Sequence, residues 1–262
     1  MVRQTPSRFV RGWMLVVIAA IAPMSGAAAA ELLVRTQGEF RDAVKNAEPG
    51  DEILLADGIW SDFQMVFEAT GTADAPIVLR AETPGEVFIT GSSNLRVGGE
   101  HLVIRGLTFR DGASPTGEVV SFRRDSRTLS HHVRFTENVI DHFNKEQRQD
   151  QDSWVVLYGR NNRVDHNAFL GKTNRGPTMI VRLNTEESQQ NGHVIEENFF
   201  GGRPPLGGNG GETLRIGVSQ TSRTASQTLV RRNYFERCDG EVEIISIKSE
   251  ENLITENVFF ES

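Results

Sequence analysis

A short motif recurs along the second half of the chain and limits the folds that this sequence can adopt. Each copy has apolar residues at alternate positions on both sides of an asparagine, as in His-Val-Arg-Phe-Thr-Glu-Asn-Val-Ile at residues 132–140. The asparagines are Asn138, Asn167, Asn198, Asn233 and Asn257, so successive copies are 29, 31, 35 and 24 residues apart. A repeat of this length with one strand-turn-strand unit per copy indicates stacked coils, each burying the apolar face of its neighbour.

An earlier copy, at residues 102–109, has Gly106 where we place the asparagine. Asn and Gly both tolerate the left-handed conformation that a sharp corner requires, and stacked asparagines can also hydrogen-bond from coil to coil. We therefore predict an all-β, right-handed parallel β-helix within a domain at residues 31–262. Thr36 is a suitable N-cap for a helix at residues 36–48, which we expect to cover the N-terminal end of the solenoid.

Residues 1–30 have the pattern of a secretory signal peptide, with three arginines, an apolar run at residues 13–22 and three alanines at residues 28–30. Without them the chain keeps 25 basic and 35 acidic residues, a net charge of −10. We expect an exported protein, periplasmic or extracellular, with no membrane span after cleavage and no nucleic-acid partner. Cys238 is the only cysteine, and we interpret it as a buried structural residue.

An acidic segment, Cys-Asp-Gly-Glu-Val-Glu-Ile-Ile-Ser-Ile-Lys-Ser at residues 238–249, is the strongest candidate for chemistry. Read as a strand, it places Glu241 and Glu243 on one face and Val242 in the core. The doubled isoleucine at 244–245 breaks the alternation, which would bring Ser246 and Lys248 to the outer face. Paired carboxylates favour a cation, and oxygen ligands suit Ca²⁺. The alternative is a solvated face with Lys248 as its ion-pair partner.

One coil earlier, Asn209 precedes two glycines in Asn-Gly-Gly-Glu-Thr-Leu-Arg-Ile-Gly. Stacking would bring Asn209 close to Glu241, where its amide oxygen is a further ligand for Ca²⁺, unless it is an ordinary turn residue. A strand from Glu212 would place Glu212 and Arg215 on opposite sides. Arg215 suits either a substrate carboxylate or Glu243 as its partner. Tyr158 is either a core residue or a platform on which a sugar stacks.

Together these motifs resemble polysaccharide lyase family 6, the alginate lyase and chondroitinase B family, and the resemblance covers most of the chain. It implies a Ca²⁺ site at Asn209, Glu241 and Glu243 and a catalytic base at Lys248. It also implies substrate contacts at Arg215, Tyr158 and Glu212. The family has a second catalytic residue, an arginine about one coil after the lysine, and this sequence ends at Ser262 before that position. We accordingly expect a C-terminally truncated member. For the exposed end of the last coil, either the sequence is a fragment or the cap is supplied by something else.

The implied reaction is β-elimination on a 4-O-linked uronate polymer, in which the C5 proton leaves and the O4 leaving group departs. The acidic chain, with no added basic cluster for sulfates, favours alginate over dermatan sulfate as the substrate. Three alternatives stay open: a non-catalytic Ca²⁺-dependent polysaccharide-binding solenoid, a purely structural β-helix, and an epimerase that removes the same proton. The sequence leaves the oligomeric state open.

Overall fold

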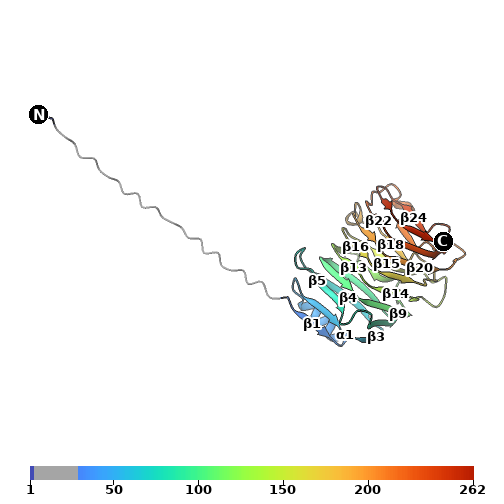
Figure 1. Cartoon of the computed structure of the whole chain (residues 1–262), viewed down its shortest axis with the longest axis horizontal. Helices are drawn as coiled ribbons and strands as arrows, with labels where there is room; N and C mark the ends of the chain where they lie inside the picture. Colours follow the sequence, from blue (N-terminus) through green and yellow to red (C-terminus); the bar gives the residue numbers. More distant parts are fainter. Residues whose placement is uncertain (3–28) are drawn as a thin grey trace.

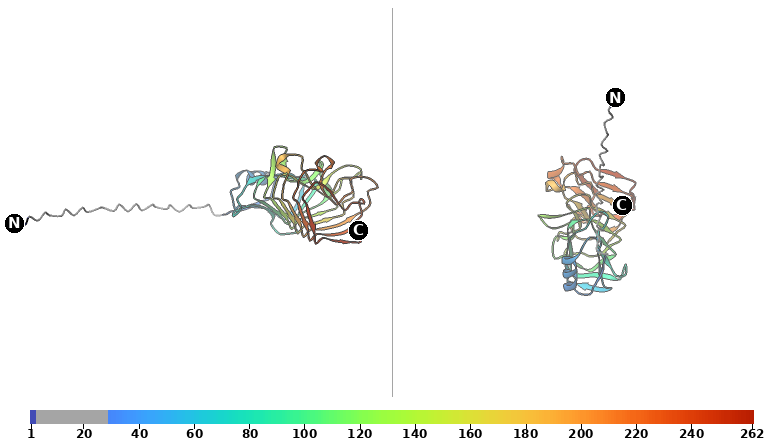
Figure 2. Two further views of the ribbon diagram at one scale, coloured as in Figure 1. Left: turned by 90° about the horizontal axis from the view of Figure 1, so that it is seen from above. Right: turned by 90° about the vertical axis from the view of Figure 1, so that its left-hand side faces the viewer.

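The computed structural model describes residues 1–2 and 29–262. Residues 31–260 form one solenoid of parallel coils with three sheets along its length (Figure 1). Most of the predicted signal peptide lies outside the described residues, and that interpretation stays a prediction. Within the described residues, no helix is long and apolar enough to cross a membrane. The coils stack from β1 near the N-terminal end to β25 and β26 near the C-terminus (Figure 2). The predicted parallel β-helix is confirmed.

The first sheet contains one strand from each coil, and its strands are paired in parallel. In spatial order they are β1 (Glu31–Val34), β2 (Glu52–Leu55), β5 (Ile77–Ala81), β8 (Leu102–Arg105), β13 (Arg134–Thr136), β16 (Arg163–Asp165), β19 (Val194–Glu196), β22 (Leu229–Arg231) and β25 (Leu253–Thr255).

The second sheet carries the candidate site. Its parallel strands are β4 (Gln64–Thr70), β7 (Asn94–Glu100), β10 (Glu118–Ser121), β15 (Ser153–Leu157), β18 (Met179–Val181), β21 (Leu214–Gly217) and β24 (Ile245–Lys248). An antiparallel hairpin of β11 (Arg123–Asp125) and β12 (Thr128–His131) joins it through β7. Two short 3₁₀ helices, η1 (Glu186–Ser188) and η2 (Ser219–Thr221), lie in the connections that leave this sheet.

The third sheet closes the coil. Its strands, all parallel, are β3 (Gly58–Ser61), β6 (Val87–Ser92), β9 (Leu107–Ala113), β14 (Val139–Asp141), β17 (Ala168–Leu170), β20 (Phe199–Arg203), β23 (Tyr234–Cys238) and β26 (Val258–Phe260). Phe169, Phe200 and Phe235 stack inside the solenoid, and the exposed Phe259 continues this stack at the C-terminal end, with centroid separations of 4.8 to 5.0 Å. Cys238 is buried as predicted, and burial raises the pKa of its thiol to about 11.

The predicted helix is α1 (Gln37–Asn46), which packs against β1, β2 and β4 at the N-terminal end. The Thr36 hydroxyl accepts a hydrogen bond from the Glu39 N–H at 3.1 Å, as expected of an N-cap. Phe40 is fully buried and meets Phe63 edge to face, with ring centroids 5.2 Å apart. The helix thus seals this end of the core.

The repeated asparagines form the predicted hydrogen-bond ladder, but they do not adopt the left-handed conformation that was also predicted for them. Each amide donates to the side-chain oxygen of the next asparagine, at 3.2 Å from Asn138 to Asn167 and 3.0 Å from Asn167 to Asn198. The left-handed residue is the one before each asparagine, such as Glu137 with φ of 57°. Gly106, with φ of 76°, stacks on Glu137 rather than on Asn138. The asparagine is therefore selected for its buried hydrogen bonds, not for its backbone conformation.

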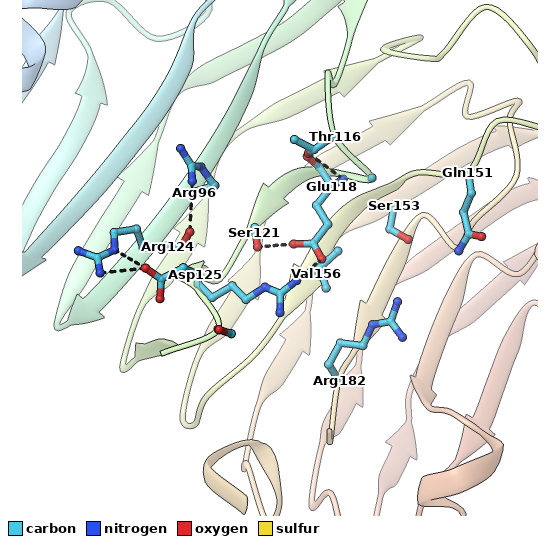
Figure 3. Close-up of a pocket in the computed structure, with 13 residues that line it drawn as sticks. Arg96, Thr116, Glu118, Ser121, Arg124, Asp125, Gln151, Ser153, Val156 and Arg182 are labelled. Carbon is cyan, nitrogen blue, oxygen red and sulfur yellow. Dashed lines mark hydrogen bonds and ion pairs between the residues drawn. The ribbon is translucent and has the colours of Figure 1, made fainter. Parts of the chain in front are cut away.

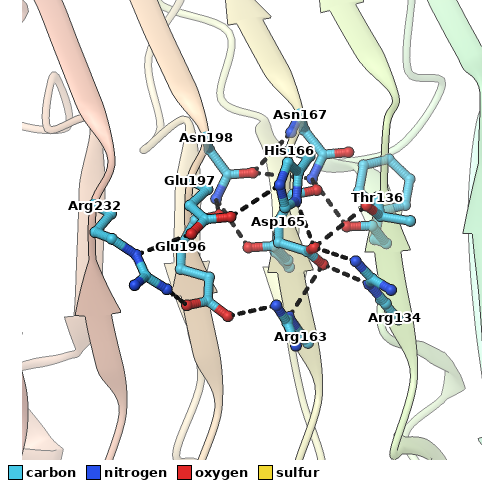
Figure 4. A network of polar contacts seen from close by, with 12 residues as sticks. Arg134, Thr136, Arg163, Asp165, His166, Asn167, Glu196, Glu197, Asn198 and Arg232 are labelled. Carbon is cyan, nitrogen blue, oxygen red and sulfur yellow. Dashed lines mark hydrogen bonds and ion pairs between the residues drawn. The ribbon is translucent and has the colours of Figure 1, made fainter.

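On the outer face of the first sheet, buried carboxylates bind arginines from neighbouring coils (Figure 4). Asp165 is fully buried and pairs with Arg134 at 2.5 Å. Glu196 pairs with Arg163 at 2.7 Å and with Arg232 at 3.1 Å. Burial raises the pKa of Asp165, but the hydrogen bonds from Arg134 and His166 outweigh it and hold that pKa below its ordinary value. Each carboxylate thus stays ionised and ties adjacent coils together.

Candidate active site

The two glutamates of the acidic segment lie in a bend before β24, not in a strand. Val242, which we predicted to face the core, is fully exposed. Register stacks Ile245 and Ile247 on the buried Leu214 and Ile216, as the predicted alternation requires. Ile247 is nevertheless 51% exposed and Ser246 is buried, so the expectation that Ser246 emerges at the outer surface was wrong. The prediction failed for Val242 because the chain turns at Gly240, which packs against Gly211 too closely to accept a side chain.

Glu241 is joined to the Asn209 loop, as stacking of adjacent coils predicted. Its Oε2 accepts hydrogen bonds from the backbone N–H of Gly210 at 3.0 Å and of Gly211 at 2.9 Å. Two amide donors fix the orientation of this carboxylate. Asn209, directly before these glycines, is exposed to solvent.

A buried arginine, Arg203, which the sequence analysis did not identify, holds the backbone of the Asn209 loop in place. The Arg203 guanidinium donates to the carbonyl oxygens of Gly176 at 2.9 Å, Gly210 at 3.0 Å and Gly211. Burial lowers the pKa of Arg203 to about 10. No motif or period marks this residue in the sequence; its only signal is a charge within a stretch rich in Gly and Pro.

The oxygen donors of the predicted Ca²⁺ site are available for a cation. Glu243 accepts a hydrogen bond from the Ser246 hydroxyl at 2.7 Å and is otherwise exposed. Among the described residues, neither Glu241 nor Glu243 forms an ion pair, and in each the second carboxylate oxygen has no hydrogen-bond donor. With the amide oxygen of Asn209 they are a set of hard oxygen ligands, which fits Ca²⁺. The described part of the chain contains no cluster of three or more His, Cys, Asp or Glu residues placed to hold a metal ion.

Lys248 is the last residue of β24 and is partly buried beside Gly217 of β21. The alternative interpretation made it the ion-pair partner of the glutamates. In the described residues its ammonium group lies within 4.0 Å of no carboxylate. The amine is therefore not held by the acidic segment that precedes it.

Arg215 pairs with Glu212 rather than with Glu243. Its Nε lies 2.8 Å from Glu212 Oε1, and its Nη2 binds the same oxygen. The expectation that Glu212 and Arg215 point to opposite sides was wrong, because β21 begins only at Leu214 and strand alternation does not extend back to Glu212. Glu212 is fully buried, so its contact is with Arg215 and not with a bound polymer.

A small hollow of about 230 Å³ joins Asn209 to Arg215. Gln151 and Arg175 complete its polar lining, and neither was identified from the sequence. Both lie in long polar insertions of preceding coils. No repeat or motif in the sequence predicts the conformation of these insertions. Two guanidinium groups and two amides facing one hollow are suited to an anionic, hydroxyl-rich ligand.

Tyr158 is a buried residue, and the sugar-stacking interpretation is wrong. Its ring is covered by the guanidinium of Arg123, with 4.0 Å from Cζ to the ring centroid. Its hydroxyl donates to Glu118 Oε1 at 2.7 Å, and burial raises its pKa above the ordinary value. With the ring face occupied, no sugar can stack on it.

Comparison with known proteins gives the family. The chondroitinase B family model matches residues 34–262. The PL6 family alginate lyase AlyGC is 59% identical, with a TM-score of 0.88 over 88% of this chain and 32% of that one. A mannuronic acid specific family 6 lyase from human gut microbiota is 35% identical, with a TM-score of 0.83 over 88% of this chain and 54% of that one.

A third structure, the PL6 family polysaccharide lyase Pedsa3628 from Pseudopedobacter saltans, is 28% identical, with a TM-score of 0.77 over 87% of this chain and 52% of that one. No curated protein matches the chain. The chain spans about a third of the length of AlyGC and about half of the length of the other two. The match over nearly all of the solenoid shows that this chain belongs to the chondroitinase B family, polysaccharide lyase family 6.

Proposed function

We propose that this chain is a Ca²⁺-dependent polysaccharide lyase that cleaves alginate by β-elimination, with Lys248 as the base. The observation that supports this most is the convergence of adjacent coils on one outer face. The Asn209 loop binds Glu241, the same hollow contains Arg215, and β24 ends at Lys248. AlyGC, to which this chain is similar, is an alginate lyase.

In this proposal Arg215 binds the substrate and Lys248 removes its proton. Arg215, held by Glu212, binds a uronate carboxylate and orients the sugar ring. The neutral amine of Lys248 accepts the C5 proton, the C5–H electron pair forms the C4–C5 double bond, and the C4–O4 bond breaks. The departing O4 takes up a proton, and no described residue is assigned as its donor.

Asn209, Glu241 and Glu243 would hold the Ca²⁺. The C5 proton is weakly acidic because the adjacent carboxylate already carries a negative charge. A bound Ca²⁺ supplies the positive charge that stabilises the additional charge developed on that carboxylate during proton removal.

The test is the ultraviolet absorbance of alginate incubated with the protein, measured in Ca²⁺ and again with a chelator. Elimination makes an unsaturated uronate, so absorbance should rise in Ca²⁺ and stay flat after chelation. A flat trace from folded protein in Ca²⁺ would contradict the proposal.

Lys248→Ala separates a lyase from a protein that only binds polysaccharide. A lyase should lose turnover by at least a hundredfold while its affinity for alginate changes little, because general-base catalysis contributes about 10²–10⁴ in rate. Equal turnover in the variant and the parent would remove Lys248 from the mechanism.

A further inference from the structure

A second hollow, next to the site described above, lies on the second sheet and has a volume of about 620 Å³. It extends from Arg96 on β7, across Glu118 and Ser121 of β10, to Arg182 directly after β18 (Figure 3). Arg123 and Arg124 of the β11–β12 hairpin form a further part of its lining. It therefore follows the stack of coils instead of crossing a single one.

The carboxylates in this hollow already have partners. Glu118 accepts hydrogen bonds from the Tyr158 hydroxyl at 2.7 Å and from Arg123 at 3.0 Å, and Ser121 donates to its other oxygen. Asp125 accepts from Arg124 Nε at 3.0 Å. Each of these two acids is thus matched by an arginine on the hairpin.

Two further arginines have no acidic partner. In the described part of the chain, neither Arg96 nor Arg182 forms an ion pair. Arg96 makes one long bond, 3.4 Å, to the Arg124 carbonyl, and Arg182 Nε is buried without a hydrogen-bond acceptor. In a chain with a net charge of −7, this leaves a local excess of positive charge in a hollow that a ligand can enter.

The hollow adjoins the candidate active site. Gln151 lines both this hollow and the smaller one that contains Asn209 and Arg215. Along the outer face of the sheet, register places Arg96 four strands from Arg215, through Ser121, Val156 and Ile180. Four strand spacings are about 19 Å, a span that only a polymer of several sugar units would bridge.

We propose that Arg96 forms a remote carboxylate-binding subsite for an acidic polysaccharide whose cleavage point lies at Lys248. Arg182 follows β18, the strand next to β21, and so lies between this subsite and the candidate active site. This inference rests on the proposed function and extends it. The polymer runs along the stack of coils, so its carboxylates meet one positively charged region at the hollow and another at Arg215. Thr116, Ser153 and Gln151 offer hydroxyl and amide groups to the sugar hydroxyls between them.

The experiment measures calorimetric affinity for a uronate dimer and a uronate decamer, each with Lys248→Ala protein so that neither ligand is cleaved. Arg96→Gln is then added, which leaves every ion pair of the hollow in place. It should raise the Kd of the decamer roughly tenfold, the loss of one charged hydrogen bond, and leave the Kd of the dimer unchanged.

Arg105→Gln is the matched control, because it removes the same charge from β8 of the first sheet. A decamer Kd that is unchanged in Arg96→Gln, or that rises equally in Arg105→Gln, overturns the subsite. An equal loss for dimer and decamer also overturns it, because Arg96 would then act at the cleavage site. If protein without these changes binds neither oligomer, the proposed function itself fails. If that protein binds and cleaves both oligomers but Arg96→Gln behaves as the parent, only the subsite fails.

Discussion

Glu212 and Arg215 form an ion pair at the edge of the candidate site, with the carboxylate fully buried and the guanidinium at the surface of a hollow. The pair spans three residues at the start of β21, where the chain has not yet adopted strand geometry. Because Glu212 has no access to solvent, it acts through Arg215 and is a positioning residue.

Glu212→Gln should therefore weaken substrate binding more than catalysis. The amide keeps the shape of the side chain but lowers the charge that holds Arg215, so we expect KM for polyuronate to rise about tenfold with kcat within a factor of about two. Steady-state kinetics on alginate would check this. A fall in kcat at unchanged KM would instead assign Glu212 to the chemical step.

Removal of Ca²⁺ should lower the thermal stability of the chain, since a ligand that binds only the folded state stabilises it. At a concentration about 100 times Kd the gain is about 2.7 kcal/mol. Calorimetry of Glu241→Gln and Glu243→Gln should show a smaller Ca²⁺-dependent rise in Tm than the parent. Glu250→Gln, which removes an exposed carboxylate nearby, should keep the full rise; the same rise in all four proteins would place the ion elsewhere or nowhere.

Asn198→Ala should destabilise the solenoid strongly. Asn198 accepts from the Asn167 backbone N–H at 3.1 Å and donates to the carbonyls of Val164 and Glu196 at 2.9 and 3.0 Å. The alanine leaves these buried groups without partners, at about 1–3 kcal/mol each, so denaturant unfolding should show a loss of ~3 kcal/mol or more. Exposed Asn46→Ala should change the free energy of unfolding by less than about 0.5 kcal/mol; a comparable loss in both variants would remove the ladder as the cause.

His193 should make the fold sensitive to mild acid. It is fully buried, and desolvation lowers its pKa to about 3, from an ordinary value of 6.5. The folded state keeps this imidazole neutral while the unfolded chain binds a proton below pH 6.5. The free energy of unfolding should therefore fall as pH decreases through this window, by up to about 1.4 kcal/mol per pH unit.

His193→Asn should reduce that slope. The Nδ1 of His193 accepts the Asn162 N–H at 3.2 Å, and an asparagine amide oxygen offers an acceptor at the same place. Asn162 already occupies the matching position of the preceding coil, where it accepts from the Val133 N–H. The check is urea unfolding between pH 7 and pH 5, and equal slopes in the two proteins would show that another group carries the effect.

The repeat and the motifs predict the fold class, the start of the helix and the proximity of two parts of the candidate site. Five asparagines at coil-length spacing predicted the parallel β-helix, because a buried hydrogen-bond ladder requires the same residue type in every coil. Thr36 and Glu39 predicted the start of α1, since capping is a local interaction. The closeness of the Asn209 loop to Glu241 followed from one coil of separation, and the hydrogen bonds of Gly210 and Gly211 confirm it.

Tertiary structure alone decided what each side chain meets. Alternation placed Val242 in the core, but the close packing of Gly240 on Gly211 turns the chain and exposes it. The burial of Glu212 and Tyr158 depends on groups three and forty residues away, Arg215 and Glu118, and no local pattern encodes such pairs. The sequence determines which coils stack, because that depends on repeated local geometry, whereas contacts between loops of variable length are set only when the coils are assembled.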